Sequence, residues 1–131
     1  MPDESHAHIG ASALLARFFR GLDMFEPDDA AACFAAQGTW LRKGSLLTGP
    51  AEIAEALGER AAERRTCHSV SNLVVTREGE MIRARYYLTV WASKPGAPLQ
   101  TEFVLDSSDL MTMTGQGLRL FEKRSTPLLR G

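Results

Sequence analysis

The stretch Met81–Ser93, MIRARYYLTVWAS, alternates between apolar side chains and side chains that are mostly polar or aromatic. Its apolar face consists of Ile82, Ala84, Tyr86, Leu88 and Val90. Its other face includes Arg83, Arg85, Tyr87 and Trp91. Because successive side chains of a β-strand point to opposite faces of the sheet, this period of two predicts a long strand with one buried face.

Further strands flank this one on both sides. The turn Arg77–Glu80 is short enough to join a strand over Thr66–Thr76 to Met81–Ser93, and such a short turn predicts an antiparallel hairpin. A third long strand is expected over Leu99–Met113, and a shorter fourth strand over Gly117–Thr126. The second half of the chain therefore reads as an antiparallel meander.

The first half of the chain has helical spacing instead. Leu14, Leu15, Phe18, Phe19, Leu22 and Phe25 form one apolar stripe along the first predicted helix. The predicted helices cover Ser5–Phe25, Asp28–Phe34 and Pro50–Glu63. Gln37-Gly38 is expected to end the second of them. A short strand pair over Thr39–Leu47, with a turn at Lys43-Gly44, separates the second helix from the third.

Helices followed by strands indicate an α+β fold rather than an alternating α/β fold. We expect one domain over residues 1–131, with three N-terminal helices packed on a strongly curved antiparallel sheet. Such a sheet, closed at one side by helices, leaves a cavity between the layers. The expected result is a cone-shaped barrel with a central pocket that is mostly apolar and holds a few inward-facing polar groups.

The composition excludes several function classes. The chain has 131 residues, 44% of them hydrophobic, and a formal net charge of −1 with mixed charges, so we expect no nucleic-acid partner. It has no apolar run long enough for a membrane helix and no signal-peptide order at its start, which predicts a cytoplasmic protein without a membrane partner. Cys33 and Cys67 fit no metal spacing and are expected to be reduced, buried side chains.

His68 is the first candidate for chemistry. On a strand it would share one face with Val70 and Asn72, and a histidine on an apolar face is costly to bury unless it has a partner. Imidazole titrates near neutral pH, so His68 could act as a general acid or base, with Asn72 holding a substrate oxygen. The alternative is a core histidine that bonds a neighbouring backbone or hydroxyl group.

Asp23 is the second candidate. It lies near the C-terminus of the first predicted helix, where the helix dipole disfavours a negative charge. A cation or hydrogen-bond donor would compensate it, and His68 could be that group. We therefore predict a dyad in which Asp23 orients His68, while a solvated Asp23 in the turn before Pro27 remains the alternative.

Aromatic side chains complete the candidate site. Trp40 and Tyr86 are candidates for substrate binding, although core packing is their alternative role. Trp91 lies on the more polar face of its strand, which favours an interface and predicts a homodimer through the sheet. His6 and His8 have no third ligand in view, so we expect no metal site. Nucleotide-binding and nucleophile-elbow motifs are absent from the sequence, and we expect no cofactor.

The layout resembles the SnoaL-like branch of the nuclear-transport-factor-2-like superfamily. The residues that carry this resemblance are Leu22-Asp23, Gly49 with Ile53, Arg65–Asn72 and Leu120–Arg124. The string from Arg65 to Asn72 is similar to the β subunits of aromatic-ring-hydroxylating dioxygenases. In scytalone dehydratase and hexachlorocyclohexane dehydrochlorinase, which share the fold, an Asp and a His form the acid/base couple at positions that match Asp23 and His68.

Two functions follow from the resemblance. One is a small cofactor-free lyase or isomerase that acts on an apolar, aromatic or polyketide-like molecule through His68 and Asp23. The other is a non-catalytic subunit or binding module, as in the dioxygenases, whose chemistry belongs to the α subunit. The chain departs from scytalone dehydratase at two positions. It has Leu22 where that enzyme has a tyrosine, and its Ala92 lies near the position of that enzyme's second catalytic histidine. The resemblance therefore does not imply the specific activity of either enzyme.

Overall fold

The computed structural model describes residues 3–130, and in them it contains three helices and six strands. The helices are α1 (Glu4–Asp23), α2 (Pro27–Ala31) and α3 (Gly49–Gly58). The strands are β1 (Phe34–Arg42), β2 (Ser45–Thr48), β3 (Arg65–Glu78), β4 (Met81–Ser93), β5 (Gln100–Thr114) and β6 (Gly117–Arg130). None of the helices in this range has the length and hydropathy needed to cross a membrane.

The six strands form one curved sheet in the order β2-β1-β6-β5-β4-β3. The predicted β3–β4 hairpin is confirmed as antiparallel, and β4–β5 and β5–β6 continue the meander. The sheet differs from a wholly antiparallel barrel in two respects. β1 pairs with β6 in parallel, and β2 and β3 remain unpaired edges, so the curved sheet stays open.

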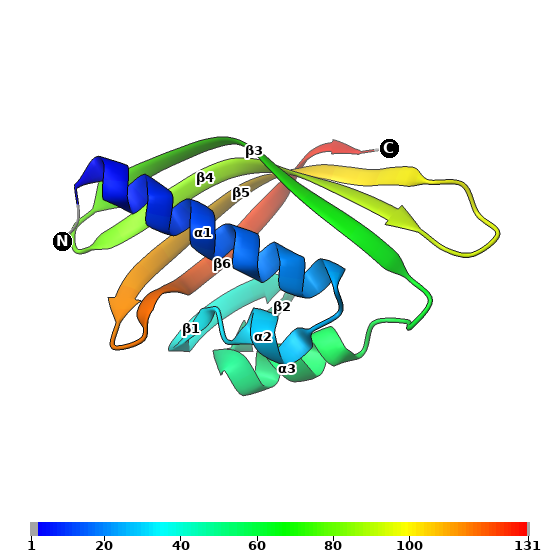
Figure 1. Ribbon diagram of the computed structural model, residues 1–131, viewed down its shortest axis with the longest axis horizontal. Helices are drawn as coiled ribbons and strands as arrows, with labels where there is room; N and C mark the ends of the chain where they lie inside the picture. Colours follow the sequence, from blue (N-terminus) through cyan, green and yellow to red (C-terminus); the bar gives the residue numbers. More distant parts are fainter. Residues whose placement is uncertain (1–2, 131) are drawn as a thin grey trace.

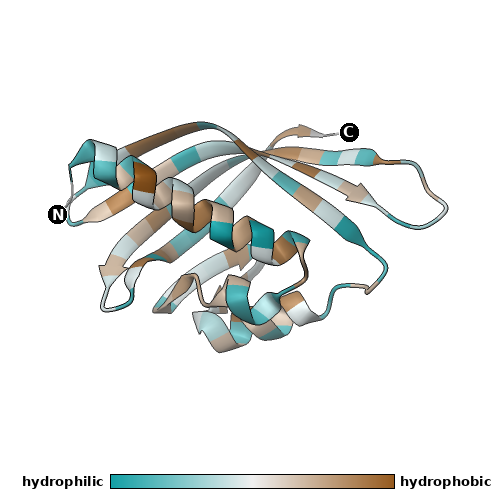
Figure 2. Cartoon of the chain, viewed as in Figure 1, coloured by the Kyte–Doolittle hydropathy of each residue, from teal (hydrophilic) through white to brown (hydrophobic). Residues whose placement is uncertain are grey.

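The core lies between α1 and the inner face of the sheet. Figure 1 shows α1 running across β3 to β6, while α2 and α3 lie together beside β1 and β2. The apolar stripe of α1 is buried there, with Phe18 and Leu15 almost inaccessible. Figure 2 shows the alternation of apolar and polar residues as bands along the long strands. The predicted buried face of β4 is confirmed, since Ile82, Ala84, Tyr86, Leu88 and Val90 are all buried.

All three predicted helices end earlier than expected. The first helix stops at Asp23 rather than at Phe25, which is exposed and adopts a φ of 54°. The second helix stops at Ala31, and Phe34 and Gln37-Gly38 lie in β1 instead, because this segment pairs with β6. Gly38 permits that close approach, since a Cβ there would lie 2.6 Å from the Leu120 carbonyl oxygen. The third helix stops at Gly58, a weak helix former beyond the last buried residue, Leu57. Residues 59–64 are therefore a loop between α3 and β3.

The prediction that His68 and Asn72 share one face of their strand is wrong, because β3 contains a bulge. The pairing of β3 with β4 shifts by one residue between Ser71 and Val74, and Asn72 adopts a φ of 55°. Side chains beyond the bulge change faces, so Leu73 is partly buried and Asn72 is exposed. Cys67 is also exposed, contrary to prediction, whereas Cys33 is buried.

Candidate active site

A cavity of about 1150 Å³ opens at the C-terminal end of α1, between the helices and the inner face of the sheet. Its apolar wall comes from α1, β1, α3, β4 and β5 through Phe19, Trp40, Leu57, Leu88, Val90 and Leu105. His68 and Thr66 of β3 contribute polar groups to the same cavity. A cavity that combines an apolar wall with convergent polar groups is typical of a small-molecule site.

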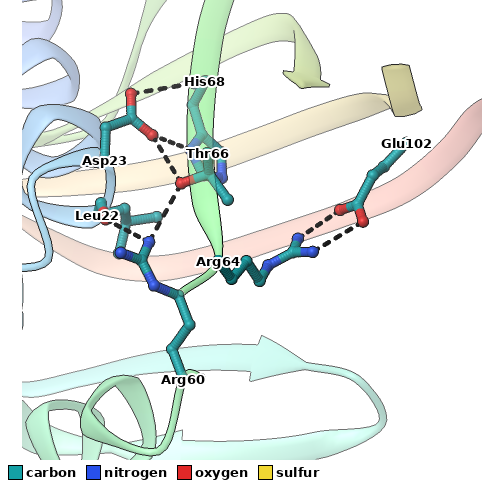
Figure 3. Close-up of polar contacts among 7 residues, drawn as sticks. All are labelled: Leu22, Asp23, Arg60, Arg64, Thr66, His68 and Glu102. Carbon is teal, nitrogen blue, oxygen red and sulfur yellow. Dashed lines mark hydrogen bonds and ion pairs between the residues drawn. The ribbon is translucent and has the colours of Figure 1, made fainter. Parts of the chain in front are cut away.

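The predicted contact between Asp23 and His68 is confirmed. Asp23 Oδ1 lies 2.6 Å from His68 Nδ1, and the two side chains are only 14% and 13% exposed. Figure 3 shows the carboxylate at the end of α1 facing the imidazole on β3. The geometry is that of an oriented acid/base pair, whereas its catalytic role remains a prediction.

Further donors explain why an acid is tolerated at the C-terminus of α1. Asp23 Oδ2 accepts from the backbone N–H of His68 at 3.0 Å, and Asp23 Oδ1 accepts from the Thr66 hydroxyl at 3.1 Å. With His68 Nδ1, three donors therefore surround the carboxylate. These three hydrogen bonds offset the unfavourable interaction of the carboxylate with the helix dipole.

Arg60 fixes the direction of the Thr66 hydrogen bond. Its Nη1 donates to Thr66 Oγ1 at 3.2 Å and to the Leu22 carbonyl oxygen at 2.9 Å (Figure 3). A guanidinium has no acceptor, so Thr66 must receive that bond and can direct its single hydrogen to Asp23. The chain Arg60–Thr66–Asp23–His68 therefore has one consistent set of donors and acceptors.

The same set of bonds assigns the histidine tautomer. An ionised Asp23 can only accept, so His68 Nδ1 carries a hydrogen, and in the neutral imidazole Nε2 then holds the lone pair. The imidazole stacks on Phe19, with ring centres 5.3 Å apart and planes 18° from parallel. Within residues 3–130, Nε2 has no hydrogen-bond partner, so it is the ring nitrogen available to a ligand in the cavity.

A second polar cluster, formed by Lys123, Asp109 and Tyr86, adjoins the cavity. Lys123 Nζ donates to Asp109 Oδ2 at 2.8 Å and to the Tyr86 hydroxyl at 2.7 Å, and that hydroxyl donates to Asp109 Oδ2 at 2.6 Å. All three residues are buried, and burial raises the pKa of Tyr86 well above its usual range, so the phenol keeps its proton. Lys123 also lines the cavity.

The other predicted site residues have different outcomes. Trp40 lines the cavity, whereas Tyr86 is buried in the Lys123 cluster and is not part of the cavity wall. Asn72 is exposed and does not line the cavity either. The sequence reasoning missed Arg60, Thr66 and Lys123. Thr66 could have been found, because it lies two residues before His68 and therefore on the same face of the strand. No sequence pattern distinguished Arg60 from the neighbouring arginines.

Several solved structures of other proteins share this fold. A structure from Catenulispora acidiphila is 18% identical with a TM-score of 0.87, covering 95% of this chain and 93% of that chain. An NTF2-like protein with a cystatin-like fold from Novosphingobium aromaticivorans is 19% identical with a TM-score of 0.83, covering 94% and 82%. A candidate dehydratase of the NTF2-like family from Streptomyces avermitilis is 12% identical with a TM-score of 0.81, covering 95% and 98%. At these identities the likeness concerns the fold alone.

The family is assigned from the sequence rather than from these structures. No curated protein matches the chain significantly. The family model of the SnoaL-like domain matches residues 5–114, which include α1 from its second residue, the whole of β3 and the Asp23–His68 pair. The chain belongs to the SnoaL-like domain family.

Proposed function

We propose that this protein is a cofactor-free acid/base enzyme that isomerises, dehydrates or otherwise eliminates from an apolar, aromatic or polyketide-like small molecule. The observation that carries the proposal is the 2.6 Å contact of Asp23 with His68 at the wall of an open cavity. A cavity of about 1150 Å³ beside this pair favours an enzyme over a non-catalytic subunit, whose interior would be filled.

In the proposed reaction, His68 Nε2 removes a proton from a carbon of the bound substrate. Asp23 holds the hydrogen of the neutral imidazole on Nδ1, which leaves the lone pair on Nε2, and it stabilises the imidazolium that forms afterwards. His68 then returns the proton to another carbon in an isomerisation, or to a leaving hydroxyl in a dehydration.

Solvent deuterium exchange tests this reaction type before the substrate is known. A panel of apolar ketones and aromatic polyketide-like carbonyl compounds is incubated with the protein in D₂O, and ¹H NMR follows the loss of α-proton signals. We expect the protein to accelerate exchange for part of the panel and His68→Gln to abolish the acceleration. Failure of the protein to accelerate any exchange, or full activity of His68→Gln, would contradict the proposed function.

We also propose that the protein is a homodimer through the outer face of the sheet. On this face of β4, Tyr87 is 39% exposed and Trp91 is 38% exposed. Two-fold pairing of this face would cover both rings. Light scattering at micromolar concentration is expected to give twice the chain mass, and Trp91→Glu to give the monomer mass with an unchanged far-ultraviolet spectrum. A monomeric unsubstituted protein would contradict the assembly.

A further inference from the structure

The cavity concentrates positive charge in a chain that is nearly neutral. The whole sequence contains 15 basic and 16 acidic residues. Among the described residues, the cavity wall includes six basic side chains, Arg42, Lys43, Arg60, Arg64, Lys123 and Arg124, and two acidic ones, Glu59 and Glu102. A pocket for a wholly apolar ligand needs no such excess of cations. The positive charge of the wall therefore indicates a ligand with a negatively charged group.

Some of these cations already have partners inside the protein. Arg64 makes two hydrogen bonds to Glu102, and Lys123 pairs with Asp109. Arg124 lies 3.9 Å from Glu122. These side chains are compensated and do not by themselves point to an anionic ligand.

Arg42 is different. It is partly buried on β1, and within residues 3–130 it makes no hydrogen bond or ion pair with another side chain. Burial lowers its pKa, against a weaker opposite effect of the Glu59 charge. Its guanidinium carbon lies 5.5 Å from the centre of the Trp40 ring, two residues earlier on the same strand face. A cation is therefore held beside an aromatic surface of the cavity, with the Glu59 charge nearby but with no ion pair among the described residues.

Arg60 is a second cation of the cavity that forms no ion pair within residues 3–130, although the charge of Asp23 acts on it favourably. Its Nη1 bonds only to neutral oxygens of Leu22 and Thr66, and its Nε is buried without a hydrogen-bond partner. Burial is also the largest cause of its lowered pKa. Partly desolvated guanidinium groups without an anion are unfavourable, and a bound anion would remove that penalty.

We propose that the cavity binds an apolar acid, whose carboxylate is received by Arg42 while its apolar body lies against Trp40 and extends towards His68. Arg60 adds a second positive charge to the same cavity. The planar guanidinium fork of Arg42 matches a carboxylate, and the Trp40 ring next to it matches an aromatic or polycyclic body. The proposal rests on the proposed function insofar as it names the class of substrate. The binding of an apolar acid can nevertheless be measured without any turnover.

Isothermal titration calorimetry with 2-naphthoate and 2-naphthamide tests the subsite, because the two probes share one apolar body and differ in charge. We expect naphthoate to bind roughly tenfold more tightly than naphthamide at low ionic strength. Arg42→Gln should remove roughly that tenfold preference and leave naphthamide binding unchanged. Arg42→Lys, which keeps the charge, should retain part of the preference.

Arg65→Gln is the matched control. Arg65 is exposed, lies at the start of β3 and does not line the cavity, so the same loss of charge there should leave both affinities unchanged. Equal binding of the two probes, an unaltered preference in Arg42→Gln, an equal loss in Arg65→Gln, or no binding of naphthoate would each overturn the proposal.

The same titration on His68→Ala separates this proposal from the proposed function. A naphthoate preference that survives in His68→Ala supports the carboxylate subsite whether or not the protein accelerates deuterium exchange. Exchange activity together with no preference for naphthoate would overturn the subsite and leave the acid/base reaction standing.

Discussion

Asp23→Asn is expected to lower the turnover rate by roughly three to four orders of magnitude, as a carboxylate-to-amide change beside a catalytic histidine does. The carboxylate accepts on both oxygens, from Thr66 and His68 Nδ1 on one and from the His68 backbone on the other. The single oxygen of asparagine can serve only one of these positions. Either its amide group faces Nδ1 and favours the wrong tautomer, or the backbone N–H of His68 loses its acceptor.

The measurement is the rate of deuterium exchange, or of turnover once a substrate is found, together with the melting temperature. Asp28→Asn makes the same chemical change on an exposed acid of α2 and should affect neither quantity. Thr66→Val should lower the rate less than Asp23→Asn does, because it removes one of the three donors and leaves the carboxylate charge. An Asp23→Asn variant that melts early but keeps its rate would show that the pair is structural.

Lys123→Met is expected to destabilise the fold by about 3–5 kcal/mol, the usual loss when one partner of a buried ion pair is removed. Asp109 is fully buried, and its Oδ1 already lacks a hydrogen-bond partner. Without Lys123, its other oxygen would keep only the Tyr86 hydroxyl. The protein would then hold a buried carboxylate without a cation.

Urea unfolding followed by circular dichroism measures this effect. The double variant Lys123→Met with Asp109→Leu should recover much of the lost stability, because it removes both charges at once. Arg124→Met, at the neighbouring exposed position, should change the free energy of unfolding by less than about 1 kcal/mol. A loss of that small size in Lys123→Met would mean that the cluster contributes little to stability.

The regular elements followed from local patterns in the sequence. The period of two over Met81–Ser93 predicted β4 with the bounds that the structure has, and the short turn before it predicted the hairpin with β3. The apolar stripe of α1 predicted both its buried face and the position of Asp23 at its end. These features depend on neighbouring residues, so the sequence alone was sufficient for the α+β class. The contact of Asp23 with His68, which are 45 residues apart, was predicted from the resemblance to enzymes of this fold and from the unfavourable position of Asp23 at the helix end.

Two irregularities of backbone geometry could not be predicted in the same way. The third predicted helix continued to Glu63, but it ends at Gly58, and only the resulting loop lets Arg60 reach Leu22 and Thr66. The bulge in β3 moves Asn72 away from the face of His68. Both features depend on contacts between segments far apart in the sequence, which local propensity does not contain.

The Lys123 cluster depends most completely on tertiary structure. Counted from the β5–β6 turn, Asp109 would oppose Glu122, a repulsive pair. The register of the two strands shifts between Leu110 and Met111, so Lys123 lies opposite Asp109 instead. Periodicity in the sequence was sufficient for the long strands and the first helix, because their side chains alternate with a fixed local spacing. The fold alone decided which charges meet in its interior, because one extra residue in a strand changes every pairing beyond it.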